Sequence, residues 1–502
     1  MTLMNRILRH KTVEQLQTEV GQRRDFRRVL GLWQLTAIGI GGIIGVGIFV
    51  LAGQQAALNA GPAVALSFII AGFGSACAAL CYAEFAGLIP VTGSAYTYGY
   101  AVLGEGAAWI IGWDLLLEYA LVVAVVAIGW SGYVQVLLQS LFGVVLPVWA
   151  QKSMSADTMS YYVQQAMGAV GWHSAHPVAG PSDGHRFNVI AAGISLAVAV
   201  LLSVRTEWGA RFNTIIVAIK VIGVMLVIGV GVFYINTANW HPFVPERVLD
   251  ATGAGHFGWS GVLTGASVVF FAVFGYDTLT TAAEEAKNPQ RDLPRAVLLS
   301  LAVAMALYIA VSLVLTGVVH YSQLGGEASV SDAFNAIGLH WLSNVIAFAA
   351  VVGVVSVLFA FMLGAARIWF ALSRDGLLPA WFARVHPRYG TPARPTMILG
   401  VFTAIVAGLL PIGEVAELVN IGTLSAFILI CASVMVLRVR KPDLQRNFRT
   451  PAVLVVAPLG IVFSLALIYG LPWITFERFI IWMALGLIVY FAYGIRHSKL
   501  NR

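Results

Sequence analysis

The chain has little charge and few cysteines. Only 11% of its 502 residues are charged and 59% are hydrophobic, whereas a soluble protein has about 25% charged residues, so an ordinary soluble domain is excluded. The three cysteines, Cys77, Cys81 and Cys431, all lie in apolar stretches, which argues against a disulfide framework. No phosphate-binding loop motif, histidine pair at metal-ligand spacing or catalytic constellation occurs. We therefore expect no enzyme, no metal and no other cofactor.

Long apolar runs dominate what is present. A helix needs about 20 apolar residues to cross a bilayer, and about 12 stretches of the chain are long enough. They predict an all-α polytopic membrane protein, with approximate spans at residues 33–53, 63–88, 107–140, 187–204, 211–235, 260–283, 296–319, 340–371, 396–412, 416–437, 451–472 and 476–495.

The basic residues predict the orientation. With these spans, most of the 30 Lys and Arg fall on one side of the membrane. Cytoplasmic loops carry the excess of positive charge, so we expect both termini, including the segment 1–30, to be cytoplasmic. The net charge of +7 reflects this topology, and no nucleic-acid partner is expected. The chain has no N-x-Ser/Thr sequon, which favours a bacterial inner membrane with lipid as surroundings.

Glycines interrupt two of the spans. The first contains AIGIGGIIGVGIFVLAG at residues 37–53, and the sixth contains SVVFFAVFGYDTLTTAAEEAKNPQRD at residues 267–292. Hydrocarbon cannot hydrogen-bond an unwound backbone, so such breaks survive only where they face protein or line a cavity. Paired breaks in two halves of a membrane protein point to a substrate site. Five spans, an odd number, precede the sixth span. The second half of the chain therefore enters the membrane from the side opposite to the one from which the first half enters.

The counting predicts discontinuous helices 1 and 6 in a five-plus-five inverted repeat. We expect a first five-helix repeat at residues 31–235, a second repeat at 260–437, and two additional transmembrane helices at 451–495.

Four motifs resemble a known family. The segments GIGGIIGVGIFVLAG, VFFAVFGYDTLTTAAEEAKNPQRDLPRA and ARIWFALSRDGLLP resemble the amino acid–polyamine–organocation (APC) superfamily of permeases. The segment WDLLLEYALVVAVVAIGWSGY is similar to the third span of its cationic amino acid transporter branch. The resemblance implies the leucine-transporter fold and a secondary transporter of amino acids.

The breaks offer groups that suit a zwitterion. After Gly45, Val46 and Gly47, a new helix N-terminus presents N–H groups and a positive dipole end to a carboxylate. Carbonyls around Ile43 and Ile44 are acceptors for the ammonium. In the sixth span the corresponding carbonyls, released by Gly275, belong to Phe270, Val273 and Phe274. The resemblance assigns Val46 and Gly47 to the carboxylate, and Ile43 and Phe274 to the ammonium. The alternative is that the glycines only permit close helix packing.

Further residues are candidates for gating and proton coupling. The resemblance makes Phe271 the aromatic that closes over substrate; a core aromatic is the alternative. Lys220 lies nine residues after Arg211, about 14 Å into its span. A lysine at that depth is expensive and indicates function, and proton-driven relatives carry a lysine on this span; a structural cation is the alternative. Glu118, about 17 Å into the third span, could take a proton or be a structural acceptor. Asp277 could cap or brace the break.

Together these features predict proton-coupled symport of a small or medium neutral amino acid by alternating access. The alternative is an exchanger or uptake system for cationic amino acids or polyamines.

Overall fold

The computed structural model describes residues 9, 30–89, 94–155, 158, 161–162, 164–165, 184–204, 210–249, 255–281, 283, 286–389 and 391–499. Most of the predicted segment 1–30 lies outside these residues. The described part is helical apart from one pair of two-residue antiparallel strands, β1 (Val248–Leu249) and β2 (Gly255–His256).

The longer helices alternate with short connecting helices along the chain. The α-helices are α3 (Leu32–Ile43), α4 (Ala52–Gln55), α5 (Val64–Leu88), α6 (Ser94–Val102), α7 (Glu105–Phe142), α8 (Val148–Gln151), α10 (Val189–Val204), α11 (Ala210–Gly231), α12 (Gly258–Val273), α13 (Thr278–Thr281), α14 (Pro289–Val318), α15 (Ser329–Ala336), α16 (His340–Arg374), α17 (Ala393–Leu409), α18 (Ile412–Arg440), α19 (Val453–Tyr469), α20 (Trp473–Val489) and α21 (Ile495–His497).

Tighter and wider helical turns join several of these elements. They are the π-helical η1 (Gly47–Leu51), η2 (Ala56–Ala60) and η9 (Tyr490–Gly494), and the 3₁₀ turns η3 (Gly61–Ala63), η4 (Val232–Tyr234), η5 (Thr237–Trp240), η7 (Tyr321–Gln323) and η8 (Ala380–Ala383).

Apolar helices make up the membrane part of the described chain. Seven are long and apolar enough to cross a bilayer, and five more are shorter apolar helices. Each stretch predicted from the sequence overlaps one of them. The chain is thus a polytopic, all-helical membrane protein.

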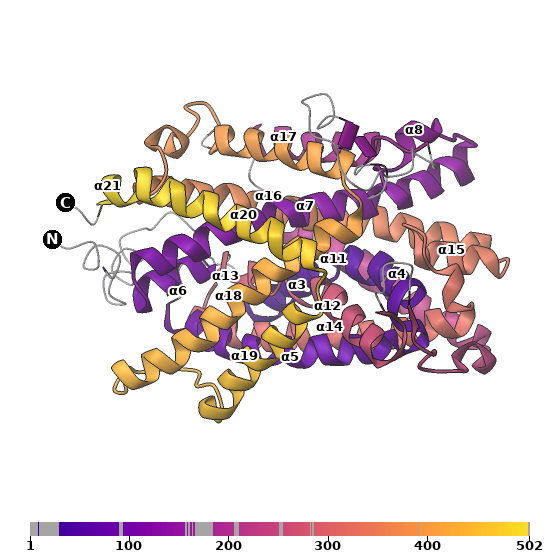
Figure 1. Ribbon diagram of the computed structural model, residues 1–502, viewed down its shortest axis with the longest axis horizontal. Helices are drawn as coiled ribbons and strands as arrows, with labels where there is room; N and C mark the ends of the chain where they lie inside the picture. The colour runs from indigo at the N-terminus through magenta and orange to yellow at the C-terminus, as the bar shows by residue number, and fades with distance from the viewer. Residues whose placement is uncertain are drawn as a thin grey trace.

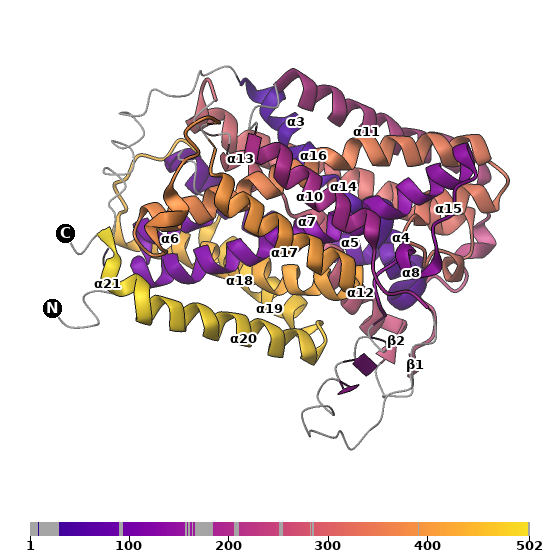
Figure 2. The ribbon, with the colours of Figure 1, turned by 90° about the horizontal axis from the view of Figure 1, so that it is seen from above.

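The two longest helices run through the centre of the molecule. α7 has 38 residues and α16 has 35, so each is more than about 50 Å long, well above the hydrocarbon thickness of about 30 Å. In both views α6 and α21 lie at one end of the molecule, and α8 and α15 lie at the other (Figure 1, Figure 2). The breaks in the first and sixth predicted spans lie between these ends.

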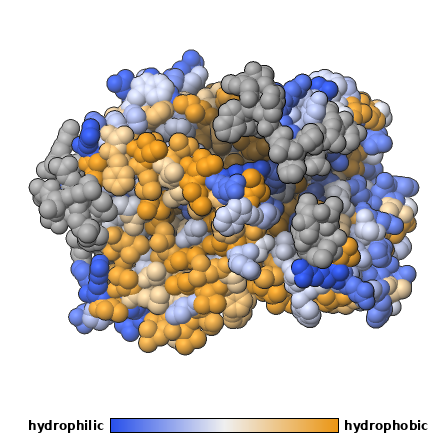
Figure 3. Space-filling model, viewed as in Figure 1, coloured by the Kyte–Doolittle hydropathy of each residue, from blue (hydrophilic) through white to orange (hydrophobic). Residues whose placement is uncertain are grey.

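A broad part of the surface is apolar, as a lipid-facing surface must be. In Figure 3 hydrophobic residues gather over the left and lower centre of the visible face, and hydrophilic residues lie at both ends and in smaller patches between them. Tryptophans near helix starts are largely exposed: Trp33 at 77%, Trp259 at 70%, Trp341 at 58% and Trp473 at 72%. Exposed tryptophans at helix ends are typical of the membrane–water interface.

Ion pairs fasten the end of the molecule that carries α6. Glu84 accepts from Arg438 Nη2 at 2.8 Å and lies 3.0 Å from Arg446 Nε. It also accepts from the Thr450 N–H at 2.8 Å. A single buried carboxylate on α5 thereby holds the end of α18 and the loop that follows it.

Candidate functional site

The first break separates α3 from η1. α3 ends at Ile43, Ile44 adopts extended geometry (φ −73°, ψ 101°), and η1 starts at Gly47. The first N–H groups of a helix have no acceptor inside the helix. The backbone after Gly45 therefore presents donors in the middle of the buried core, next to carbonyls at the end of α3.

The second break separates α12 from α13. α12 ends at Val273, and Phe274 is extended (φ −88°, ψ −179°). Gly275 has φ +115°, which an L side chain rarely adopts. The last four carbonyls of a helix, here those of Phe270 to Val273, accept no hydrogen bond from an N–H group of the same helix. They therefore remain available to another donor.

The two breaks touch through their backbones. A Cβ at Gly275 would lie 2.8 Å from the Gly42 carbonyl oxygen, and a Cβ at Gly42 would lie 2.9 Å from the Gly275 carbonyl oxygen. Either side chain would push the breaks apart. Glycine is therefore required at these two positions because the two backbones lie so close together. This is the close-packing role that the sequence analysis gave as the alternative for the glycines.

A small apolar cavity lies beside this contact. Its lining within the described chain comes from both breaks, α7 and α16: Gly42, Ile43, Gly45, Val46, Gly47, Val122, Val126, Phe271, Ala272, Phe274, Val357 and Phe361. Its volume is about 10 Å³, enough for about one water molecule. The cavity is therefore too small in this conformation to hold an amino acid.

The structure brings six of the ten predicted substrate-binding residues to this cavity. Ile43, Gly45, Val46, Gly47, Phe271 and Phe274 belong to its described lining, and Ile44, Phe270, Val273 and Gly275 do not.

The residues outside the lining have other contacts. Phe270 packs edge-to-face on Phe427 and stacks on Phe274. The Ile44 carbonyl accepts from Lys220, and Gly275 touches Gly42. Val273 is fully buried as the last residue of α12.

Four lining side chains come from the third and eighth predicted spans. Val122 and Val126 follow Glu118 at four-residue intervals on α7. Residues at that spacing share a helix face, so the position of Glu118 was the signal that could have found them. On α16 the same spacing places Val357 and Phe361 on the cavity side.

Lys220 binds the end of α3 at the first break. Its Nζ donates to the Gly41 carbonyl at 2.5 Å, to the Ile44 carbonyl at 2.8 Å and to Ser356 Oγ at 3.3 Å. Ser356 Oγ already donates its own proton to the Gly353 carbonyl at 2.7 Å, so it can only accept from the amine. Three acceptors match the three N–H donors of a protonated lysine.

The lysine stem is tightly enclosed. The residue is fully buried, and a Cβ at Gly353 would lie 2.4 Å from the Lys220 Cβ. α11 and α16 thus pack closely beside the lysine stem.

Tyrosine hydroxyls hold both sides of the first break. Tyr308 on α14 donates to the Ile43 carbonyl at 2.7 Å, and Tyr133 on α7 donates to the Phe49 carbonyl at 2.5 Å. The Ile43 carbonyl therefore has one lone pair engaged and one remaining for another donor. These two tyrosines were not predicted from the sequence.

Buried carboxyls surround the second break. Tyr119 donates to Asp277, which directly precedes α13. Glu118 lies close enough to Asp277 and Asp114 for their charges to interact. Glu118 does not belong to the described cavity lining. The Tyr119–Asp277 bond ties the break to α7.

A second acidic group lies at the α15 end, outside the spans. Burial raises the pKa of Glu327 to about 7, and Lys152 partly opposes the shift. Burial also raises the pKa of Asp332, again against Lys152. Glu327 packs on α7, since a Cβ at Gly132 would lie 2.8 Å from the Glu327 Cβ.

The described residues contain no cluster of three or more His, Cys, Asp or Glu side chains that could hold a metal ion. Cys77, Cys81 and Cys431 are free and buried.

Known proteins resemble this chain over most of its length. It matches the amino acid permease family over residues 30–491. It is 41% identical over 497 residues to the branched-chain amino acid permease BcaP of Bacillus subtilis (strain 168), covering 99% of each chain. It is 41% identical over 499 residues to the methylthioribose transporter of the same strain, covering 99% of this chain and 100% of that protein.

A plant relative is more distant. The chain is 34% identical over 444 residues to the vacuolar cationic amino acid transporter 4 of Arabidopsis thaliana, covering 88% of this chain and 68% of that protein. The family and these relatives indicate a transporter rather than an enzyme. The helices and these matches together show that the chain belongs to the amino acid permease family of the APC superfamily, as a multi-pass membrane protein of amino acid transport.

Proposed function

We propose that the protein is a proton-coupled symporter of neutral amino acids with apolar side chains, working by alternating access. The observation that carries this is the cavity between the two helix breaks, whose described lining has only apolar side chains beside the backbone of both breaks. Such a site pairs polar backbone groups for the zwitterion with an apolar enclosure for the side chain.

Different backbone groups bind the carboxylate and the ammonium of the zwitterion. The N–H groups at Val46 and Gly47 bind the carboxylate, aided by the positive end of the following helix. The carbonyls of Ile43 and Phe274 bind the ammonium. The Ile43 carbonyl does so with the lone pair that Tyr308 leaves available. Phe271, which is 6% exposed at the cavity, closes over the bound molecule.

The lining favours an apolar side chain. Val122, Val126, Val357 and Phe361 supply no hydrogen-bond partner, and burying a charge there unpaired costs several kcal/mol. This disfavours arginine, lysine or a polyamine, although relatives named as cationic amino acid transporters exist. It also disfavours methylthioribose, whose sugar hydroxyls need partners. Two relatives are named branched-chain amino acid permeases, so leucine, isoleucine and valine are the first substrates to test.

Lys220 supplies the coupling. Protonated, its amine holds the end of α3 at the first break against α16 through three hydrogen bonds. A neutral amine has two N–H donors, so loss of the proton releases at least one of these contacts. Because binding can shift a conformational equilibrium only by differential affinity, protonation of Lys220 must differ between the outward and inward states. Glu118 is a second proton acceptor, and Asp277 is a brace.

The wider architecture follows the same reasoning. The breaks in the first and sixth of about 12 spans support a leucine-transporter-type fold with an inverted repeat. The first repeat comprises residues 31–235, the second comprises 260–437, and two helices follow at 451–495. The excess of basic residues on one face supports cytoplasmic termini in the cell inner membrane.

Uptake into proteoliposomes tests the proposal. Labelled leucine should accumulate only with an inward proton gradient, should be displaced by isoleucine and valine, and should not need sodium. If arginine or methylthioribose displaced labelled leucine at a lower concentration than unlabelled leucine does, the proposed substrate class would be wrong. Accumulation that is driven by a trans amino acid and not by protons would indicate exchange.

A further inference from the structure

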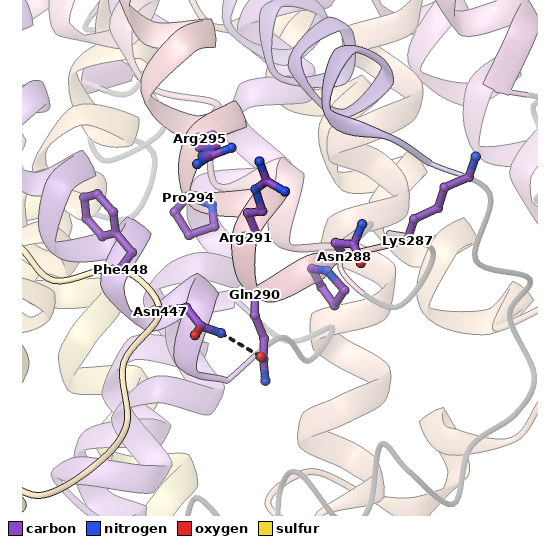
Figure 4. A pocket seen from close by; sticks show the side chains of 9 residues that line it. Lys287, Asn288, Gln290, Arg291, Pro294, Arg295, Asn447 and Phe448 are labelled. Atoms are coloured by element: carbon purple, nitrogen blue, oxygen red, sulfur yellow. Dashed lines mark hydrogen bonds between the residues drawn. The ribbon is translucent and has the colours of Figure 1, made fainter.

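A cationic hollow lies at the start of α14, and its lining shares no described residue with the proposed substrate cavity. Its volume is about 780 Å³, and its walls include Lys287, Arg291 and Arg295 together with Asn447 and Phe448 of the loop after α18. Figure 4 shows Arg291 and Arg295 projecting from neighbouring turns of α14, with Lys287 before the helix and Phe448 on the opposite side.

The cations in this hollow have no ion-pair partner among the described residues. By contrast, Arg438 and Arg446 near the same loop are both paired with Glu84. Asp292 is the nearest acidic residue in the described sequence and lies one position beyond Arg291 in the first turn of α14. Three cations and the positive end of a 30-residue helix therefore leave a surplus of positive charge.

The hollow continues into a strip that faces lipid. Arg291, Arg295, Leu299 and Val303 recur at four-residue intervals and so share one face of α14. Leu299 is 38% exposed and Val303 is 40% exposed. The change from charged to apolar takes one helical turn, about 6 Å, which matches the step from lipid headgroup to acyl chain.

The opposite wall is fixed to α14. Asn447 donates its amide to Gln290 Oε1 at 2.7 Å, as the dashed line in Figure 4 marks. Arg446, one residue earlier, is anchored by its ion pair with Glu84. These contacts keep the loop against the helix and preserve the hollow between them.

We propose that this hollow binds the phosphate of an anionic phospholipid, whose acyl chains lie along Leu299 and Val303. Arginine forks bind phosphate oxygens in pairs of parallel hydrogen bonds. Basic pockets between transmembrane helices on the cytoplasmic side suit such headgroups. A soluble anion gains nothing from the apolar strip, whereas a phospholipid uses the charged and the apolar parts together.

The test measures thermal stabilisation of the full-length transporter in detergent by added lipid. Phosphatidylglycerol should raise the unfolding temperature at lower concentration than phosphatidylcholine, and inorganic phosphate at equal concentration should not. The double variant Arg291→Gln/Arg295→Gln should need about 30-fold more phosphatidylglycerol, because each cation near an anionic surface contributes about 1 kcal/mol and each 1.4 kcal/mol is about tenfold.

The matched control is Arg384→Gln/Arg388→Gln, which removes the same charge from exposed positions outside the hollow. It should respond like the wild type. If the hollow variant does not fold, Arg291→Lys/Arg295→Lys is used instead. It keeps the positive charge but lacks the forked guanidinium groups, and it should need a phosphatidylglycerol concentration between those of the wild type and the glutamine variant. Equal responses of the hollow variant and the control would overturn the proposal, as would equal stabilisation by phosphatidylcholine. Stabilisation by inorganic phosphate alone would show a soluble-anion site instead.

Discussion

Adding one methyl group at Gly45 tests the position of the substrate directly. A Cβ at Gly45 would lie 3.6 and 3.8 Å from the two Val357 methyl carbons, which is ordinary contact. At Gly47, by contrast, a Cβ would lie 2.3 Å from the Ala272 Cβ and 2.6 Å from its Cα. Gly45→Ala therefore reduces the cavity without forcing the breaks apart, and Gly47→Ala changes the fold of the site itself.

The size of the effect follows from the packing of apolar pockets. One methylene too many in such a pocket costs about 1–3 kcal/mol, which corresponds to about 10–200-fold in discrimination. We expect Gly45→Ala to weaken leucine and isoleucine by about tenfold or more, and alanine much less. Gly45→Leu, which fills the space opposite Val357, should abolish transport while the protein still inserts into the membrane.

Competition against labelled substrate in proteoliposomes measures this. Wild type and Gly45→Ala are compared for inhibition by alanine, valine and leucine, and thermal unfolding checks that both are folded. Equal weakening of alanine and leucine would show that Gly45 contacts the amino acid backbone rather than its side chain. An unchanged profile would refute the assignment of this cavity as the substrate site.

Three further predictions concern other residues. Phe271→Ala should raise the KM for leucine about tenfold or more, whereas its neighbour Phe270→Ala should lower stability with little change in KM; the reverse pattern would contradict the cavity lining. Tyr308→Phe removes the donor to the Ile43 carbonyl and should lower the free energy of unfolding by about 1 kcal/mol, measured by thermal unfolding. Glu327, whose pKa burial raises to about 7, favours the folded state when protonated. The contribution of Glu327 to the free energy of unfolding is fully present below the ordinary pKa of a glutamate. It is lost as pH rises through about 7, which lowers the free energy of unfolding by up to about 3 kcal/mol. Glu327→Gln should lose this decline between pH 5 and pH 8, and an unchanged decline would assign it to another group.

Much of the architecture could be predicted because it depends on local composition. Uninterrupted apolar runs predict membrane helices, and each predicted run overlaps an apolar helix of the described chain. Glycines at Gly42 and Gly275 marked the places where two backbones approach. Neither inference needs knowledge of which helices are neighbours.

The faces of the helices could not be predicted in the same way. Phe270 and Phe271 are consecutive, so their side chains point about 100° apart on the helix; one packs on Phe427 and the other lines the cavity. In a uniformly apolar helix the hydrophobic period does not distinguish these faces. For the same reason the apolar pattern alone does not separate Val122 and Val126 from core residues; only their four-residue spacing from Glu118 does.

Contacts between segments that are distant in the chain could not be predicted from the sequence either. Tyr308 reaches the Ile43 carbonyl across 265 positions of the chain, and Arg438 reaches Glu84 across 354. Lys220 stood out because its depth in the membrane is expensive, but its hydrogen bonds to the end of α3 and to Ser356 depend on how α11 packs against α3 and α16.

The most direct test of the proposed mechanism is substrate accumulation by Lys220→Met. This substitution removes the amine that donates to Gly41, Ile44 and Ser356 and keeps an unbranched side chain in the space beside Gly353. In proteoliposomes the variant should still exchange labelled leucine for unlabelled leucine across the membrane. It should not accumulate leucine when an inward proton gradient is imposed, whereas wild type does. If Lys220→Met concentrates leucine under the gradient as wild type does, the lysine is structural and the account of coupling is wrong.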